Sequence, residues 1–200
     1  MSSAIKFVTA ADGVNIAYEA DGTGPPLLYV RGWISNLELQ RQDEAIERLF
    51  RPLRDHRTVV RYDSRGNGLS DWELPGPITE HALLADLEAV ADTIDGPFDI
   101  WATTYGGPLA IDYIVDHPDR INKVILDGTY ARGATFVSED QAEAMFDLLA
   151  MARVSPDIVF SSLSFMTDPD PLITHEARVE RMRKSISPAA VEPLYRIAFE

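Results

Sequence analysis

Residues 98–108, which read FDIWATTYGGP, include the residues best placed to do chemistry. An apolar run leads through two glycines into a stretch with helical spacing, which predicts a tight strand-to-helix turn at Thr104. Such a turn holds a hydroxyl clear of the sheet, beside the N–H groups of a helix N-terminus. The usual pattern of a nucleophile elbow is G-x-S-x-G, and here Ala102 and Thr104 replace its first glycine and its serine. Thr104 is therefore either a nucleophile or a side chain that only packs a degenerate turn.

The other titratable residues form no metal or cofactor motif. The chain has no cysteine and four histidines, with no His-x-x-x-His pair and no close Asp/His cluster. It also has no glycine-rich loop of the dinucleotide-binding type. We therefore expect no cofactor and no metal. Among the histidines, only His175 could reach Thr104, and only if the C-terminal part folds down over it.

Strand and helix patterns alternate from Leu27 to Leu126. Apolar runs predict strands at 27–30, 58–62, 98–103 and 124–126, after a hairpin formed by 5–9 and 14–19. Helical spacing predicts helices at 39–54, 79–94 and 106–115 between them. This alternation is typical of a parallel sheet with helices on both faces. After Gly133 only helical patterns follow, at 138–153, 171–184 and 187–199.

Composition limits the possible partners. The net charge of −14 argues against nucleic acid and against an anionic membrane, because both need a basic footprint. The first residues are polar, and no apolar run approaches the ~18 residues of a membrane span. We therefore expect a cytoplasmic location and a small-molecule substrate or ligand.

Four ordered motifs carry a family resemblance. They are VRGWISNLEL at 30–39, RYDSRGNGLSD at 61–71, TTYGGPLAIDYIVDHPDRI at 103–121 and VILDGTYARG at 124–133. In these the chain resembles the α/β-hydrolase superfamily, and more narrowly the hydrolase modules found beside adenylate-cyclase or LuxR-type regulatory domains. The resemblance implies an α/β-hydrolase core over residues 1–134, with a mostly parallel sheet and flanking helices. For residues 135–200 it implies a helical cap.

The resemblance also implies roles at the catalytic site. Thr104 stands at the nucleophile position, and the N–H groups of Tyr105 and Trp33 would hold the oxyanion. Asp127 is the plausible acid within this chain, and bracing of its loop is the alternative role. In the family the acid and the histidine usually follow the cap. We therefore expect the last core strands and two of the three triad members to lie outside this sequence.

A ligand site is implied around Arg31, Gly32, Gly106 and Tyr130. Arg31 stands where hydrolases often carry His and where this subfamily carries Pro. It would either attract a carboxylate or phosphate, or form an ion pair with Asp63. Gly32 is expected to permit a close approach of two backbone segments.

Two functions of different classes follow from these observations. The first is hydrolysis of a small ester or acyl substrate, with an atypical threonine elbow and an incomplete triad. The second is a catalytically inactive pseudo-hydrolase that binds a ligand or a protein. The family's strand order leaves the strand at 124–126 as an unpaired sheet edge, which would accept a second copy or another partner chain.

Overall fold

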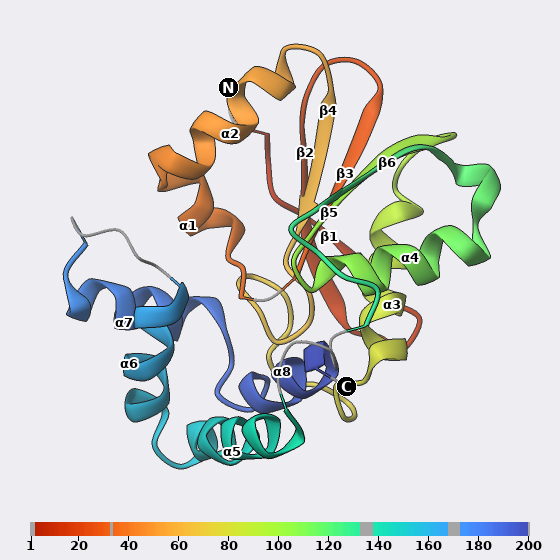
Figure 1. Cartoon of the computed structure of the whole chain (residues 1–200). Helices are drawn as coiled ribbons and strands as arrows, with labels where there is room; N and C mark the ends of the chain where they lie inside the picture. The colour runs from red at the N-terminus through yellow and green to blue at the C-terminus, as the bar shows by residue number, and fades with distance from the viewer. Residues whose placement is uncertain (1–2, 33, 133–137, 168–172, 200) are drawn as a thin grey trace.

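One six-stranded sheet organises the chain (Figure 1). The computed structural model describes residues 3–32, 34–132, 138–167 and 173–199. The strands are β1 (Lys6–Thr9), β2 (Asn15–Gly22), β3 (Pro26–Arg31), β4 (Thr58–Tyr62), β5 (Phe98–Thr103) and β6 (Ile121–Asp127). Their order is β1-β2-β4-β3-β5-β6, and β4, β3, β5 and β6 are parallel neighbours. The hairpin of β1 and β2 is antiparallel. The mostly parallel sheet predicted from the sequence is therefore confirmed.

Helices cover both faces of this sheet and the carboxyl ends of its parallel strands. They are α1 (Leu37–Gln42), α2 (Glu44–Arg54), α3 (Glu80–Ala91), α4 (Gly106–Asp116), α5 (Glu139–Ala150), α6 (Pro156–Thr167), α7 (His175–Ser185) and α8 (Val191–Phe199). Figure 1 shows α1 and α2 on one side of the sheet and α3 and α4 on the other. The last four, α5–α8, gather beyond the ends of the strands, and we call them the C-terminal helices. None of the helices in the described ranges is long and apolar enough to cross a membrane.

The two-residue period of the strands divides the core between the two faces. On β3, Leu28 and Val30 join the larger cluster, which α3 and α4 cover. Leu27 and Tyr29 join a smaller cluster around Phe50 of α2. Burying one such side chain contributes about 1.5–3 kcal/mol, so the helices on both faces hold the sheet in place.

Two predicted helical segments differ in the structure. The helix expected over 39–54 is interrupted at Asp43, whose backbone is extended and whose carboxylate accepts hydrogen bonds from the N–H groups of Ala45 and Ile46. Asp43 therefore begins a second helix, as N-cap residues do. The helix α6 was not predicted. The expected start of the helix at 171–184 lies partly outside the described residues.

The turn-rich loop at 63–71 joins the sheet to the C-terminal helices. Buried Asp63 accepts hydrogen bonds from the N–H groups of Leu37 and Leu69, at 3.1 and 3.0 Å. Arg65 of this loop pairs with Asp86 of α3 at 2.7 Å. From the same loop, the Gly68 N–H donates to the Ser185 carbonyl at 2.9 Å. The bond from Gly68 therefore holds the end of α7 against this loop.

Candidate active site

The turn between β5 and α4 presents Thr104 at the carboxyl end of a central strand. Thr104 has φ +48°, and it is the one residue other than glycine with positive φ in the described part of the chain. Its side chain is exposed. A left-handed backbone costs a residue with a Cβ about 1–2 kcal/mol, and such costs concentrate at functional sites. The strand–turn–helix arrangement predicted at Thr104 is thus present, with the hydroxyl outside the core.

Glycines allow the neighbouring strand to approach this turn closely. A Cβ on Gly32 would collide with Tyr105, and a Cβ on Gly106 would collide with the carbonyl of Val30. Gly32 therefore permits the close backbone approach that we expected of it. Gly106 is buried under the turn, which gives it a packing role and leaves it off the cavity described below.

Hydrogen bonds fix the turn from two sides. The Thr129 hydroxyl donates to the Thr104 carbonyl, and the Gly32 N–H donates to the Thr103 carbonyl at 3.2 Å. The Thr104 hydroxyl donates to the Gly32 carbonyl at 3.4 Å, which is long for this kind of bond. A substrate would therefore displace little when it approaches that oxygen.

A cavity of about 590 Å³ opens in front of Thr104. This volume lies within the range of small-molecule sites. Its lining is largely apolar, with side chains from β3, α2, the turn, the loop after β6, α6 and α8. The aromatic lining residues are Tyr29, Phe50, Tyr105, Tyr130, Tyr195 and Phe199. The Tyr130 hydroxyl donates to the Ala198 carbonyl at 2.8 Å, which connects the loop after β6 to α8.

Sequence reasoning found only part of this lining. Phe146 of α5 lies in the core and not on this lining, in edge contact with the ring of Tyr195 at 5.9 Å between centroids. Tyr195 and Phe199, which sequence reasoning missed, line the cavity. Their i, i+4 spacing on α8 is the signal that could have indicated a shared face.

The backbone at the start of α4 offers a donor for an oxyanion. Within the described residues, the N–H of Tyr105 makes no backbone hydrogen bond. The Tyr105 side chain is buried, and this burial raises the pKa of its hydroxyl. The second donor that we expected, Trp33, lies outside the described residues.

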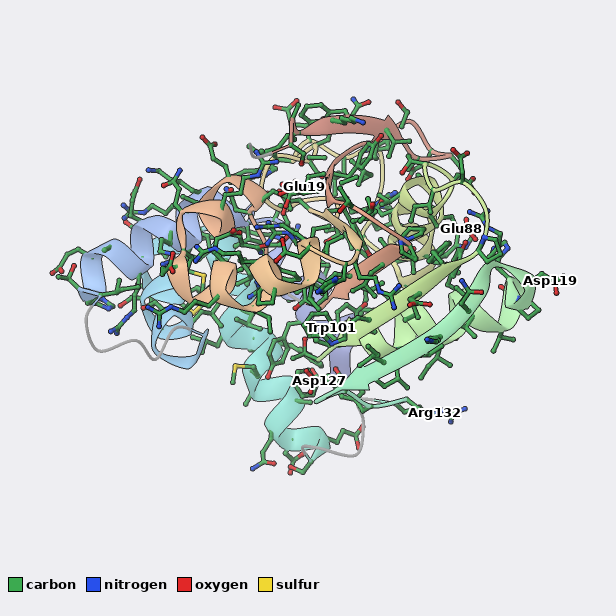
Figure 2. All side chains as sticks on the ribbon, turned by 90° about the horizontal axis from the view of Figure 1, so that it is seen from above. Glu19, Glu88, Trp101, Asp119, Asp127 and Arg132 are labelled. Atoms are coloured by element: carbon green, nitrogen blue, oxygen red, sulfur yellow. The ribbon has the colours of Figure 1, made fainter. Side chains whose placement is uncertain are left out.

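The structure brings no imidazole to Thr104 within the described ranges. His175 is 2.9 Å from the Ser161 hydroxyl through Nε2 and 3.4 Å from the Ser164 hydroxyl through Nδ1. His117 lies 3.7 Å from Glu88. Asp127 is exposed at the carboxyl end of β6, in register with Thr103 (Figure 2). The described residues also contain no group of three His, Asp or Glu side chains that could hold a metal.

Arg31 does not form the ion pair with Asp63 that we expected as one of its two roles. Asp63 is fully buried, its Oδ2 accepts hydrogen bonds from the N–H groups of Leu37 and Leu69, and its burial raises its pKa. Arg31 is exposed at the end of β3 and lines the cavity in front of Thr104. The prediction that Arg31 forms an ion pair with Asp63 was therefore wrong.

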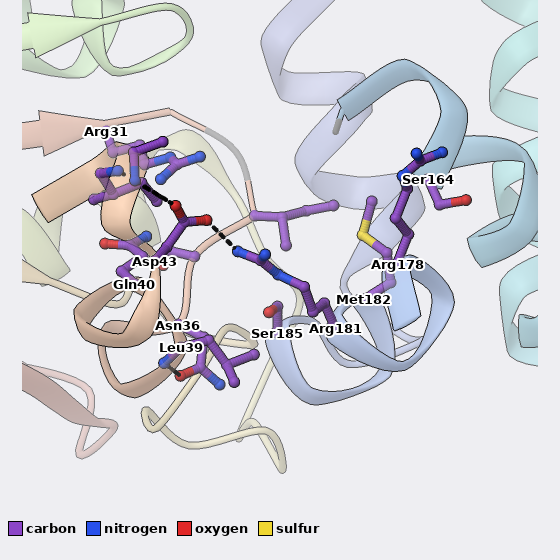
Figure 3. Close-up of a pocket in the computed structure, with 14 residues that line it drawn as sticks. Arg31, Asn36, Leu39, Gln40, Asp43, Ser164, Arg178, Arg181, Met182 and Ser185 are labelled. Carbon is purple, nitrogen blue, oxygen red and sulfur yellow. Dashed lines mark hydrogen bonds and ion pairs between the residues drawn. The ribbon is translucent and has the colours of Figure 1, made fainter. Parts of the chain in front are cut away.

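A second cavity of about 300 Å³ lies between α1–α2 and α6–α7, and Arg31 lines it as well (Figure 3). Arg181 of α7 pairs with Asp43 across this cavity at 2.6 Å. Desolvation opposes ionisation of Asp43, but the hydrogen bonds from Arg181 and from the Ile46 N–H outweigh it and lower its pKa. This ion pair holds the C-terminal helices against the α1–α2 segment.

Comparison with known proteins assigns the family. Residues 25–155 match the sequence profile of the alpha/beta hydrolase fold family. The chain belongs to this family, in agreement with its sheet order and with the position of the turn at Thr104.

Individual relatives differ from this chain in length. A non-heme haloperoxidase of Rhodococcus erythropolis is 33% identical over 125 residues, which cover 61% of this chain and 43% of the relative. An esterase of Thermogutta terrifontis superposes with a TM-score of 0.71 at 23% identity, covering 99% of this chain and 73% of that one. An esterase of Exiguobacterium antarcticum gives 0.72 at 20% identity, with 99% and 74% covered. The chain thus matches less than half of its curated relative and about three quarters of the solved structures.

Proposed function

We propose that the chain hydrolyses a small ester or acyl substrate, with Thr104 as the nucleophile. The observation that carries the proposal is an exposed hydroxyl on a left-handed turn, in front of a cavity of about 590 Å³. The names of two solved relatives, both esterases, agree with this reaction class.

In the proposed reaction, the Thr104 oxygen attacks the acyl carbon and the hydroxyl proton passes to a base. The negative charge on the carbonyl oxygen is held by the N–H of Tyr105, with Trp33 as the second donor. The C–O bond to the alcohol then breaks, and the leaving oxygen takes the proton back from the base. Water next attacks the acyl-threonine and gives its proton to the same base, which returns it to the Thr104 oxygen as the acid is released. Losing one oxyanion donor typically costs 10²–10³ in rate, so the backbone alone contributes substantially.

The experiment compares hydrolysis of p-nitrophenyl acetate by the wild type, Thr104→Ala and Thr104→Ser. We expect Thr104→Ala to lose the activity above background. We expect Thr104→Ser to raise it, because serine lacks the methyl group that restricts χ1 and crowds the turn. Equal rates for the wild type and Thr104→Ala would refute the proposal. Bromination of monochlorodimedone is measured in parallel, since one relative is called a haloperoxidase.

One observation favours a second candidate, binding without turnover. Within the described residues no histidine is hydrogen-bonded to Thr104, so no described imidazole is in place to accept the proton. A pseudo-hydrolase would show a ligand-induced rise in melting temperature across an acyl or phenolic panel, without acylation of Thr104 in the intact mass. An acyl adduct that Thr104→Ala abolishes would exclude this candidate.

A further inference from the structure

We propose that Arg31 selects ligands that carry a carboxylate beside an apolar body. This inference deepens the proposed function, since it assigns a substrate class to the same cavity. It rests on the position of Arg31, on the charge around it and on the chemistry of the rest of the lining.

The strand register places Arg31 next to the turn that carries Thr104. Arg31 is the last residue of β3 and pairs with Thr103 of β5. Because side chains alternate along a strand, Arg31 lies on the same face as Tyr29, whose hydroxyl is 3.1 Å from that of Thr103. The guanidinium therefore borders the aromatic cavity from the β3 side, and it also lines the smaller cavity shown in Figure 3.

The charges around Arg31 leave it available to a ligand. Among the described residues, it is the only formally charged side chain on the lining of the larger cavity. No described carboxylate forms an ion pair with it. The smaller cavity has one acidic lining residue, Asp43, and that carboxylate is held by Arg181.

Arg31 differs from the buried arginines of the chain, because those form ion pairs with carboxylates. In a chain of net charge −14, acidic partners are abundant, and Arg61 and Arg65 are both buried in pairs with carboxylates. A guanidinium offers five N–H donors in a planar fork that fits a carboxylate with two hydrogen bonds. Aromatic walls around a single cation suit an amphipathic anion, such as the half-ester of a short dicarboxylic acid or an aryl-substituted fatty acid.

The test measures binding by calorimetry with two matched probes, 4-phenylbutyrate and 4-phenylbutanamide. We expect the wild type to bind the carboxylate at least tenfold more tightly than the amide. Arg31→Gln should bind the two probes equally, and Arg31→Lys should keep part of the preference because it keeps the charge but loses the fork. Arg48→Gln is the matched control, because Arg48 lies on the exposed surface of α2 in an i,i+4 pair with Glu44.

The outcomes separate this inference from the proposed function. Equal binding of both probes by the wild type, no measurable binding of the carboxylate, or a preference that survives in Arg31→Gln would each overturn the inference. Thr104→Ala should keep the ratio of the two affinities, because that ratio depends on the charge of Arg31, although Thr104 lines the same cavity. If hydrolysis proves independent of Thr104 while the preference depends on Arg31, the proposed function fails and the inference stands. If hydrolysis depends on Thr104 but the preference is absent, only the inference fails.

Discussion

The left-handed backbone at Thr104 predicts that Thr104→Gly stabilises the fold. Relief of a positive φ at a residue with a Cβ returns about 1–2 kcal/mol. Glycine costs about 0.5–1 kcal/mol through the extra freedom of the unfolded chain. The side chain is exposed and its hydrogen bond to Gly32 is 3.4 Å long, so little else is lost. The free energy of unfolding should therefore rise by up to about 1.5 kcal/mol, the largest difference between these two contributions.

The assay is urea unfolding followed by the fluorescence of buried Trp101, with the midpoint compared at unchanged slope. Thr23→Gly is the matched control, because Thr23 is an exposed threonine in a turn, with φ outside the positive range. It should lose about 0.5–1 kcal/mol from the same glycine entropy. Thr104→Ala should change stability by less than either, since alanine keeps the Cβ.

Equal destabilisation of Thr104→Gly and Thr23→Gly would refute the reasoning, because it would mean that the turn at Thr104 stores no backbone strain. The same substitution should change stability and activity in opposite directions. Under the proposed function, the variant that folds best is the one that has lost the nucleophile, as expected where stability and activity conflict.

Three further predictions follow. Desolvation raises the pKa of Asp86 to about 6. The stability gained by burying this carboxyl in its protonated form is therefore complete below pH ~4 and is lost as the pH rises through 6. Asp86→Asn should remove this pH dependence, which amounts to about 3 kcal/mol in the free energy of unfolding, and equal pH profiles for the variant and the wild type would contradict the prediction. Gly107→Ala should cost about 1–3 kcal/mol because its Cβ would meet Thr129, and Thr129→Ala should recover part of this in a double-mutant cycle. The outer edge of β6 is unpaired within the described residues and should pair antiparallel with β6 of a second copy, centred on Ile125. This register places Lys123 opposite the partner's Asp127. Sedimentation should show a dimer that Ile125→Lys abolishes.

The elements that sequence reasoning placed best are the buried parallel strands. The strand β5 spans 98–103 as predicted, because an apolar run between Pro97 and a glycine pair has few alternatives. The break at Asp43 was missed because amphipathic spacing continues on both sides of it. The helix α6 was missed although Pro156 and Asp157 form a recognisable helix start, because its serines obscure the apolar period.

The sequence was enough to predict several residues of the candidate site, but not which residues they contact. The Gly-Gly turn pointed to Thr104, but the identity of the partner of each charge depends on packing between distant elements. Asp63 and Arg31 both follow strands at the same edge of the sheet, and this proximity suggested an ion pair. The fold instead buries the Asp63 carboxylate away from Arg31, where its Oδ2 accepts from the N–H groups of Leu37 and Leu69 and desolvation raises its pKa.

The exposure of the Thr104 side chain and the strain of its backbone help to choose between its two predicted roles, nucleophile and packing residue. A threonine that only packs a turn would be buried against its neighbours, and its contacts would compensate for an unfavourable φ. Thr104 is exposed, the one hydrogen bond that its hydroxyl makes to a described residue is long, and a glycine would adopt the same backbone geometry at lower cost. A strained, solvent-facing hydroxyl in front of this cavity has little justification in packing, which supports the proposal that Thr104 acts as the nucleophile or contacts a ligand.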